Sequence, residues 1–535
     1  MTLGDVDRRR SHAALLEQAV VALTSPDLAQ IVDLVAWLDP PDALATLHGG
    51  PAPGVLVANH RGRVRLHHDG RHEVLVGDDP VASTDPMAFL PYEQEVADPS
   101  PDNERNAYPY PYRRISSLLS DPTRSPDLVV VHTPRHYFPD EGGHRGEHGS
   151  LDVVQSRAPL LLSGAGVEPR GFVDDHARLV DVGPTLAVAA GVPFDDLRDA
   201  EGAPLDGRPL ARYLTAELTG SRPGDGEWAA SRRPRWVVGL LWDGASCGDL
   251  LHLAGTGQLP AVARLIEHGV ALRGGAVAEF PSITLTNHTS ILTGVGPGRH
   301  GVLGNVFYDR ATDERVVPND SSTWHRSSEW LRPGVRTVFE MVADHVAARP
   351  DGSPRTASVD EAIDRGADYS TMAVIRASGS SSGAAGLGEM LPDPSTSPYL
   401  GEPAHLDDEY FAWATQVDDV GLQQVLQLFD APATAPVLTW WASTLTDAGH
   451  HAGGPRSSIA RDSLRDSDRR LQTFLAHLDG LGVTDDVLFV LTADHGFEAA
   501  EPSCTGSWRP ALESLGVPFR DEGPGFVYLG VASET

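Results

Sequence analysis

Short, almost uninterrupted apolar runs recur along the chain, at residues 128–132, 158–163, 235–242, 435–442 and 486–492. Strands of a parallel sheet are buried on both faces and therefore have this composition. Segments with helical periodicity alternate with these runs and begin after residues 179, 259, 335 and 463. The alternation predicts a layered α/β fold with a mainly parallel central sheet flanked by helices.

Four other segments have different patterns. Residues 54–79 alternate apolar and polar positions around a glycine-containing turn, which predicts an antiparallel hairpin or meander. Residues 1–20 lack the apolar core of a signal peptide and are interpreted as an amphipathic helix. Residues 221–235 combine proline, glycine and charge without periodicity, so they are the best linker candidate, and 378–403 is expected to be a long surface loop.

Composition narrows the possible locations and partners. No run of 18 apolar residues occurs, so a membrane span is not expected, and two cysteines, Cys247 and Cys504, suit a reducing cytoplasm. The net charge is −32 and every fixed cation is arginine, which disfavours nucleic-acid polymers and anionic membranes as partners. A small anionic substrate is compatible with this charge if bound metal ions supply a local positive charge. Solubility alone is the simpler explanation of the acidity.

Acidic and histidine side chains follow three of the apolar runs. They are Asp243, the pair Asp447 and His451, and the pair Asp494 and His495. Ligands of α/β proteins collect at the carboxyl ends of strands, where these residues are expected to lie. Individually, Asp243 could cap a helix and either histidine could be structural. Together, carboxylates with imidazoles are the ligand set expected for Zn²⁺ or a similar divalent ion.

A hydroxyl group precedes a helix-like stretch in EFPSITLTNH. Thr284 would there face backbone N–H groups and the positive end of the helix dipole, where a phosphate can bind. Next to a metal ion the hydroxyl would become a nucleophile. The alternative is that Thr284 is only a helix N-cap.

The segments WDG, FPSITLTNH, TGVGPGRHGVLGN, DAGHHAGGP and ADHG occur in this order and together resemble the type I phosphodiesterase/nucleotide pyrophosphatase family of the alkaline phosphatase superfamily. The resemblance implies an alkaline-phosphatase-like fold and two divalent ions, Zn²⁺ or alternatively Mn²⁺. It implies that Thr284 is the nucleophile and Asn305 holds the phosphoryl oxygens. The implied ligands of the first ion are Asp243, Thr284, Asp494 and His495, and those of the second include Asp447 and His451, with His450 as the alternative to His451.

In that family the second ion takes one more histidine, from an HG motif downstream of ADHG, but no histidine follows His495 here. GEHGS, at 146–150, precedes an apolar run and the segment DVGPTL, and this whole stretch resembles the missing C-terminal part of the family. The resemblance therefore implies that His148 completes the second metal site, with His144 as its competitor.

This arrangement implies a circularly permuted chain. Residues 1–220 would correspond to the C-terminal part of the family fold and 236–535 to its N-terminal part, with 221–235 joining the old ends. A cap or insertion is expected at about 310–434, and the whole chain would form one catalytic domain. The alternative is that 1–220 is a separate domain and that the remaining half is incomplete and inactive.

The function implied is hydrolysis of a small anionic phosphodiester through a phospho-threonine intermediate. Nucleotide specificity is in doubt, because Leu285 stands where the family usually has an aromatic residue that packs on the base. Trp324 and Trp330 could replace that wall, although core or cap packing explains them equally simply. The alternatives are a phosphonate hydrolase, a phosphomonoesterase, or a non-catalytic metal-stabilised binding protein.

Overall fold

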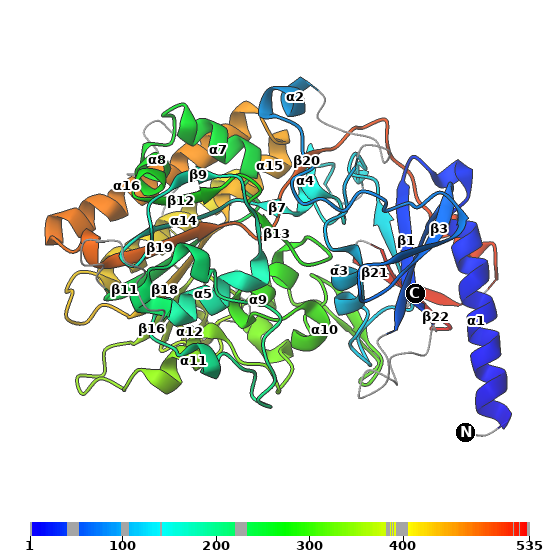
Figure 1. Cartoon of the computed structure of the whole chain (residues 1–535), viewed down its shortest axis with the longest axis horizontal. Helices are drawn as coiled ribbons and strands as arrows, with labels where there is room; N and C mark the ends of the chain where they lie inside the picture. Colours follow the sequence, from blue (N-terminus) through cyan, green and yellow to red (C-terminus); the bar gives the residue numbers. More distant parts are fainter. Residues whose placement is uncertain are drawn as a thin grey trace.

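The computed structural model describes residues 3–39, 53–97, 106–139, 142–219, 233–380, 386, 388, 390–391, 405–516, 518–523 and 525–531. Two sheets organise these residues (Figure 1). A large sheet with helices on both faces forms one end of the molecule, and a smaller antiparallel sheet covered by the N-terminal helix forms the other. Within the described residues, no helix is both long enough and apolar enough to span a bilayer.

The central sheet supports the candidate site. Within the described residues it contains eight strands in the order β17 (Tyr369–Ser370), β16 (Thr356–Val359), β18 (Leu438–Ser443), β11 (Trp236–Trp242), β19 (Val487–Thr492), β8 (Leu160–Gly164), β12 (Gly269–Leu272) and β9 (Gly171–Val173). All neighbours from β17 to β19 are parallel, as are β12 and β9. The predicted α/β fold with a mainly parallel central sheet is confirmed.

One strand of this sheet differs from the prediction. The apolar run 158–163 was expected to be parallel, but β8 is antiparallel to both β19 and β12. Leu160, Leu161 and Leu162 are fully buried between these neighbours. A continuous apolar run reports burial on both faces of a strand and carries no information about its direction.

The second sheet is antiparallel. Within the described residues it contains seven strands in the order β21 (Phe519–Glu522), β22 (Phe526–Leu529), β5 (Leu128–His132), β1 (Val32–Asp39), β2 (Gly54–Asn59), β3 (Gly62–Leu66) and β4 (His72–Gly77). β2, β3 and β4 form the predicted meander. The run 128–132 was expected to be a parallel strand, but β5 is antiparallel to β1. It is apolar because two separate core clusters cover the two faces of this sheet.

The remaining elements cover or connect the two sheets. Three short ladders lie between them: β10 (Ala177–Arg178) with β13 (Ala276–Val277) and β7 (Arg157–Ala158), β14 (Phe307–Asp309) with β15 (Glu314–Val316), and β20 (Glu498–Ala499) with β6 (Gly146–Glu147). The helices are α1 (Leu3–Leu23), α2 (Tyr92–Ala97), α3 (Pro111–Leu118), α4 (Val153–Ser156), α5 (Val182–Ala189), α6 (Ala216–Thr219), α7 (Cys247–Gly255), α8 (Pro260–Glu267), α9 (Thr284–Thr293), α10 (Pro297–His300), α11 (Val338–His345), α12 (Thr371–Ser378), α14 (Glu409–Leu428), α15 (Leu445–Gly453), α16 (Ser458–Leu481) and α17 (Arg509–Glu513). Helices α8, α15 and α16 lie over one face of the central sheet, and α5, α9 and α11 over the other (Figure 1).

Both halves of the chain contribute to each sheet. β8 comes from the first half and separates β19 from β12, which come from the second half. In the antiparallel sheet, β22 of the second half pairs with β5 of the first. Within 310–434, the range of the expected cap or insertion, β16 and β17 extend the central sheet itself. The expected linker lies largely outside the described residues, as does most of the expected loop at 378–403.

This interleaving predicts that residues 233–535 cannot fold alone. Without β8, the buried edge of β19 has no partner and β12 loses its connection to the sheet. We expect the fragment to show no cooperative thermal transition by circular dichroism, whereas co-expression with residues 1–219 should restore one. A fragment that unfolds cooperatively at the temperature of the full chain would contradict this prediction.

Candidate active site

The carboxyl ends of three adjacent parallel strands deliver most of the candidate ligands. Asp243 follows β11, and Asp494 and His495 follow β19. β18 leads into α15, whose first turn carries Asp447 and whose last turn carries His451. Because parallel neighbours end at the same edge of a sheet, the register that pairs these strands brings their ligands together.

A glycine allows the carboxylates to approach one another. Gly244 has a left-handed φ of +62°, and a Cβ there would lie 2.3 Å from the ring of Phe497 and 3.0 Å from Asp447 Oδ1. Its N–H donates to Asp494 Oδ1 at 2.9 Å. The turn after β11 therefore ties the ends of β11 and β19 together, and a side chain at this position would force them apart.

Thr284 is the first residue of α9, whose N-cap is Ile283. Ser246 occupies the N-cap position of α7, so Asp243 lies before that helix and outside its cap. Asn305 lies at the same helix end, where its Oδ1 accepts a hydrogen bond from the N–H of Leu285 at 3.2 Å.

Three histidines present the same ring nitrogen to the site. Nδ1 of His148 and of His451 each lies 3.0 Å from a backbone carbonyl oxygen, and Nδ1 of His495 lies 3.1 Å from another. A carbonyl can only accept, so Nδ1 carries the proton and Nε2 of the neutral ring keeps its lone pair. Burial lowers the pKa of His451 and His495 to about 3 and that of His148 well below its ordinary 6.5. All three rings are therefore neutral at pH 7 and able to bind a metal ion.

The ligand atoms converge in overlapping groups. Within each group they lie no more than 4.8 Å apart, and the groups are His148 with Asp447 and His451, Asp243 with Asp447 and His495, and Asp243 with His288 and Asp494. In the part of the chain that the structure describes, Asp243 Oδ1, Asp447 Oδ1, Asp494 Oδ2 and His495 Nε2 are buried without a hydrogen-bond partner. Buried polar atoms normally have partners. A cluster of unpartnered carboxylate oxygens and imidazole nitrogens fits divalent metal ions.

The electrostatics of the cluster also call for a cation. Burial, reinforced by Asp494 and Asp447, raises the pKa of Asp243 well above its ordinary 3.8. Burial likewise raises the pKa of Asp494 to about 6. Ionised carboxylates are therefore unfavourable here until an ion of opposite charge binds.

Two side chains of the site were not predicted from the sequence. His288 Nε2 lies 3.6 Å from Asp243 and 3.7 Å from Asp494, and its Nδ1 lies 2.9 Å from the buried Glu361. The signal was present, because His288 follows Thr284 by four residues and so lies on the same helix face. The hydroxyl of Tyr410 donates to Asp447 Oδ2 at 2.9 Å, and no local pattern marked this residue.

A cavity of about 310 Å³ opens over this cluster. Thr284 and Asn305 line its polar side, together with the metal-binding candidates Asp243, Asp447, His148 and His451. Its apolar and aromatic wall consists of Leu285, Trp324, Met372, Tyr410, Trp413 and Val417. Trp330, the other tryptophan considered, packs instead against two core clusters. Among the described residues that line the cavity there is no arginine.

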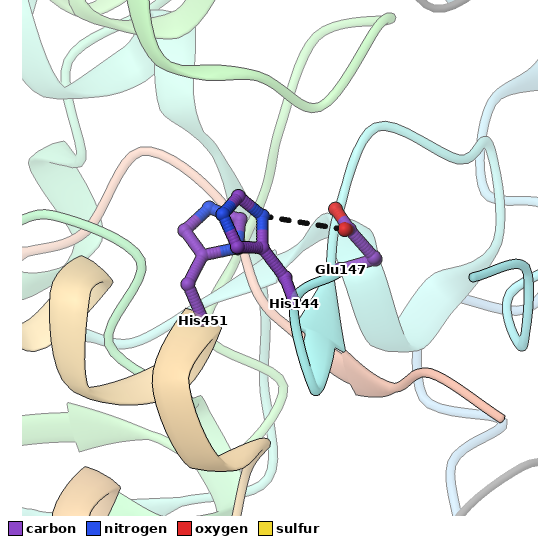
Figure 2. Close-up of side chains that lie close together, drawn as sticks. All are labelled: His144, Glu147 and His451. Atoms are coloured by element: carbon purple, nitrogen blue, oxygen red, sulfur yellow. Dashed lines mark ion pairs between the residues drawn. The ribbon is translucent and has the colours of Figure 1, made fainter. Parts of the chain in front are cut away.

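The structure also separates the histidine alternatives. His450 is buried beside Phe497, with ring centroids 5.3 Å apart, and its Nδ1 donates to the carbonyl of Thr446. It belongs to none of the ligand groups found among the described residues. His144 does not join His148 and Asp447 but lies beside His451 and next to Glu147 (Figure 2).

A model of the type I phosphodiesterase / nucleotide pyrophosphatase family matches residues 237–523, which is more than half of the chain. Among characterised proteins, alkaline phosphatase PafA of Elizabethkingia meningoseptica is 31% identical over 113 residues, or 21% of this chain and 19% of that protein. An uncharacterized pyrophosphatase/phosphodiesterase of Schizosaccharomyces pombe is 36% identical over 75 residues, or 12% of this chain and 16% of that protein. The matches thus span less than a fifth of the length of these relatives.

Two solved structures are similar over half of the chain. Phosphonoacetate hydrolase from Sinorhizobium meliloti 1021 is 26% identical, with 50% of this chain and 58% of that chain covered and a TM-score of 0.31. Murine ectonucleotide pyrophosphatase / phosphodiesterase 5 is 17% identical, with 50% and 59% covered and a TM-score of 0.35.

The buried carboxylates predict how stability depends on pH and metal. The folded-state pKa values of Asp243 and Asp494 are raised, so the unfolded chain ionises first as pH rises. Stability of the chelated protein should therefore be highest below the ordinary pKa of 3.8 and fall as pH rises towards the value of about 6 for Asp494. Zn²⁺ at 100 times its Kd should add about 2.7 kcal/mol at pH 7.

Thermal unfolding of chelated and Zn²⁺-loaded protein between pH 4 and 7 tests this prediction. Asp243→Asn should weaken the pH dependence of the chelated protein, because one of the titrating groups is removed. Two results together would show that these carboxylates bind no cation. The unfolding temperature of the chelated protein would not change with pH, and it would not rise when metal is added back.

Proposed function

The chain belongs to the type I phosphodiesterase/nucleotide pyrophosphatase family of the alkaline phosphatase superfamily, and from this we propose that it is a metal-dependent phosphodiesterase using a phospho-threonine intermediate. One observation carries the proposal. Thr284 and members of both proposed sets of metal-binding side chains, Asp243 of one and His148, Asp447 and His451 of the other, line a single cavity whose described lining residues include no arginine. Positive charge for an anionic substrate would then come from bound metal ions, since no arginine is available among the described lining residues and the sequence contains no lysine.

Each proposed ligand set combines carboxylate and imidazole. Asp243, Asp494 and His495 would hold one ion next to Thr284. Asp447, His451 and His148 would hold the other. Zn²⁺ fits this donor set best and Mn²⁺ is the alternative; two such ions would act as Lewis acids that stabilise charge on the attacking and leaving oxygens.

Thr284 is proposed to attack the phosphorus atom through its Oγ, which loses its proton as the bond forms. The bond from phosphorus to the leaving oxygen breaks, and water later hydrolyses the phospho-threonine. The position of Thr284 at the start of α9 places the phosphoryl group at the positive end of the helix dipole. Because the amide oxygen of Asn305 accepts from Leu285, its NH₂ group is the part able to donate to a non-bridging phosphoryl oxygen.

Charge favours a diester over a monoester. A diester phosphate carries one negative charge, whereas a monoester carries nearly two at neutral pH. The cavity lining contains Asp243, Asp360 and Asp447, and its described residues provide no guanidinium for the second charge. Its wall of Trp324, Tyr410 and Trp413 suits an apolar or aromatic substituent, which Leu285 alone could not stack against. We therefore propose a small phosphodiester with one such substituent.

We also propose a cytoplasmic location, which rests on the cysteines. Cys247 and Cys504 are both buried and form no disulfide, as is usual in a reducing compartment.

The nucleophile is tested on metal-loaded enzyme with a bis-aryl phosphate, an aryl phosphate and phosphonoacetate. Thr284→Ala should lose several orders of magnitude in kcat on the diester, whereas Thr284→Ser should keep part of it because the hydroxyl survives. Thr256→Ala, at the end of α7 and outside the cavity, is the matched control.

Near-normal turnover by the alanine variant would mean that another group attacks. Cleavage of the aryl phosphate faster than that of the diester would identify a phosphomonoesterase. Faster cleavage of phosphonoacetate would identify a phosphonate hydrolase. No turnover of any of the three with both ions bound would favour a binding protein.

We further propose that the chain is a circular permutant of the family fold and forms one catalytic domain. His148, from the first half, lies with Asp447 and His451 from the second. A Cβ on Gly166 would contact both Leu218 and Pro234, so the two chain segments that flank residues 220–232 lie next to each other. At the other end of the molecule, α1 packs against β22. One short connection would thus join the two ends of the unpermuted family fold, and another would join the two ends of this chain.

A rearranged gene tests the permutation. It begins at Arg232, runs through Thr535, continues through a short Gly/Ser link into Met1 and ends at Leu218. Because no strand pairing is broken, the product should unfold cooperatively and hydrolyse the same diester with a similar kcat. A Gly/Ser insertion at 221–232 of the original chain is the control. If that insertion is tolerated but the rearranged chain does not fold, the original connectivity is required.

A further inference from the structure

His144, Glu147 and His451 form a fourth group of ligand atoms, here called the outer cluster (Figure 2). All three ligand atoms lie within 4.8 Å of one another. His144 Nδ1 is 3.4 Å from Glu147 Oε1, and the rings of His144 and His451 have centroids 4.1 Å apart. Two imidazoles and one carboxylate are a ligand set that binds Zn²⁺ in many proteins.

Backbone hydrogen bonds hold the outer cluster in place. The N–H of Arg145 donates to the carbonyl of His451 at 2.7 Å, and His451 Nδ1 donates back to the carbonyl of Gly146 at 3.0 Å. β6, which contains Glu147, pairs with β20, and β20 follows shortly after His495 in the sequence. A Cβ on Gly146 would lie 2.5 Å from the carbonyl of His450, so only glycine permits this approach. The geometry is therefore built into the fold.

The outer cluster shares His451 with the proposed inner site of His148 and Asp447. Nδ1 of His451 donates a hydrogen bond to the carbonyl of Gly146, so only Nε2 has a lone pair that can bind a metal ion. One lone pair binds one ion at a time. The two sets are therefore alternatives for a single ion. They also match in chemistry, because each adds one histidine and one carboxylate to His451.

The two sets differ in how accessible their histidines are to solvent. Glu147, Asp447 and the shared His451 are all buried, so the two sets differ in their other histidine. The side chain of His144 is 35% exposed, whereas His148 stacks on the fully buried His495 with ring centroids 3.7 Å apart. His144 also lines the cavity that leads to Thr284. His144 is thus the more solvent-accessible of the two histidines that differ between the sets.

We propose that the outer cluster is a metal-ion transfer site, at which a divalent ion binds between solvent and the inner site. His451 holds the ion while His148 and Asp447 replace His144 and Glu147. No net charge changes in this exchange, because one carboxylate and one imidazole are lost and one of each is gained. The proposal rests on the two-ion function proposed for the same cavity.

A transfer site has a distinctive kinetic signature. Removing an intermediate on the path slows uptake and release of the ion by the same factor and leaves the equilibrium constant unchanged. Removing a ligand of the final site instead lowers the equilibrium affinity. His144→Ala and Glu147→Gln should therefore slow both rates of ion exchange, by about tenfold, the scale of losses seen when groups around a metal are altered.

The experiment measures Zn²⁺ uptake by the full-length apoprotein and Zn²⁺ release to a chromophoric chelator by stopped flow, with stoichiometry and affinity from equilibrium titration. His345→Ala and Asp196→Asn are the matched controls, because this partly exposed His–Asp pair, 3.0 Å apart, lies outside the cavity. His148→Ala serves as the contrasting variant and should lower affinity. Circular dichroism checks that each variant is folded.

Equal slowing of uptake and release in both outer-cluster variants, with two ions bound at equilibrium, is the expected result. Unchanged rates would overturn the transfer site. A lower equilibrium affinity of His144→Ala would overturn it too, because His144 would then be a ligand of the resident ion. Three ions bound to the wild type would also overturn it, because the two sets would then not share His451. Binding of no ion at all would overturn the two-ion function together with the transfer site, whereas normal affinity with unchanged rates would leave that function standing.

Discussion

The burial of three carboxylates at the ends of adjacent strands is the constraint on which the site depends. Asp243, Asp447 and Asp494 are brought together by the register of β18, β11 and β19 and by the turn at Gly244. Such a cluster is unfavourable without a cation, because burial and mutual repulsion both oppose ionisation. Neutral histidines oriented by backbone carbonyls surround it, so the arrangement fits divalent metal ions.

The second half of the chain alone does not complete this arrangement. β8 fills the sheet between β19 and β12, and the loop that carries His148 reaches the site through the pairing of β6 with β20. The same loop carries His144 and Glu147 to His451. One short segment from the first half thus contributes both to the proposed inner metal site and to the proposed route by which an ion reaches it.

Local sequence predicted the site better than the sheets around it. Asp243, Asp494 and Thr284 were predicted because each stands at the end of a strand or the start of a helix, which apolar runs and helical periodicity reveal. The directions of β5 and β8 were predicted wrongly, because burial on both faces is common to parallel strands and covered antiparallel ones. β1, at Val32–Asp39, was not predicted at all, although it is almost entirely buried.

The sequence by itself determined which residue types follow each strand, and therefore the family, the candidate ligands and the candidate nucleophile, because these depend on motifs a few residues long. Only the tertiary structure decided which histidines meet. It set His451 apart from His450, placed His144 outside the inner site and brought Tyr410 and His288 onto the carboxylates. These outcomes depend on contacts between segments far apart in the chain, and no local pattern encodes the distance between two such side chains.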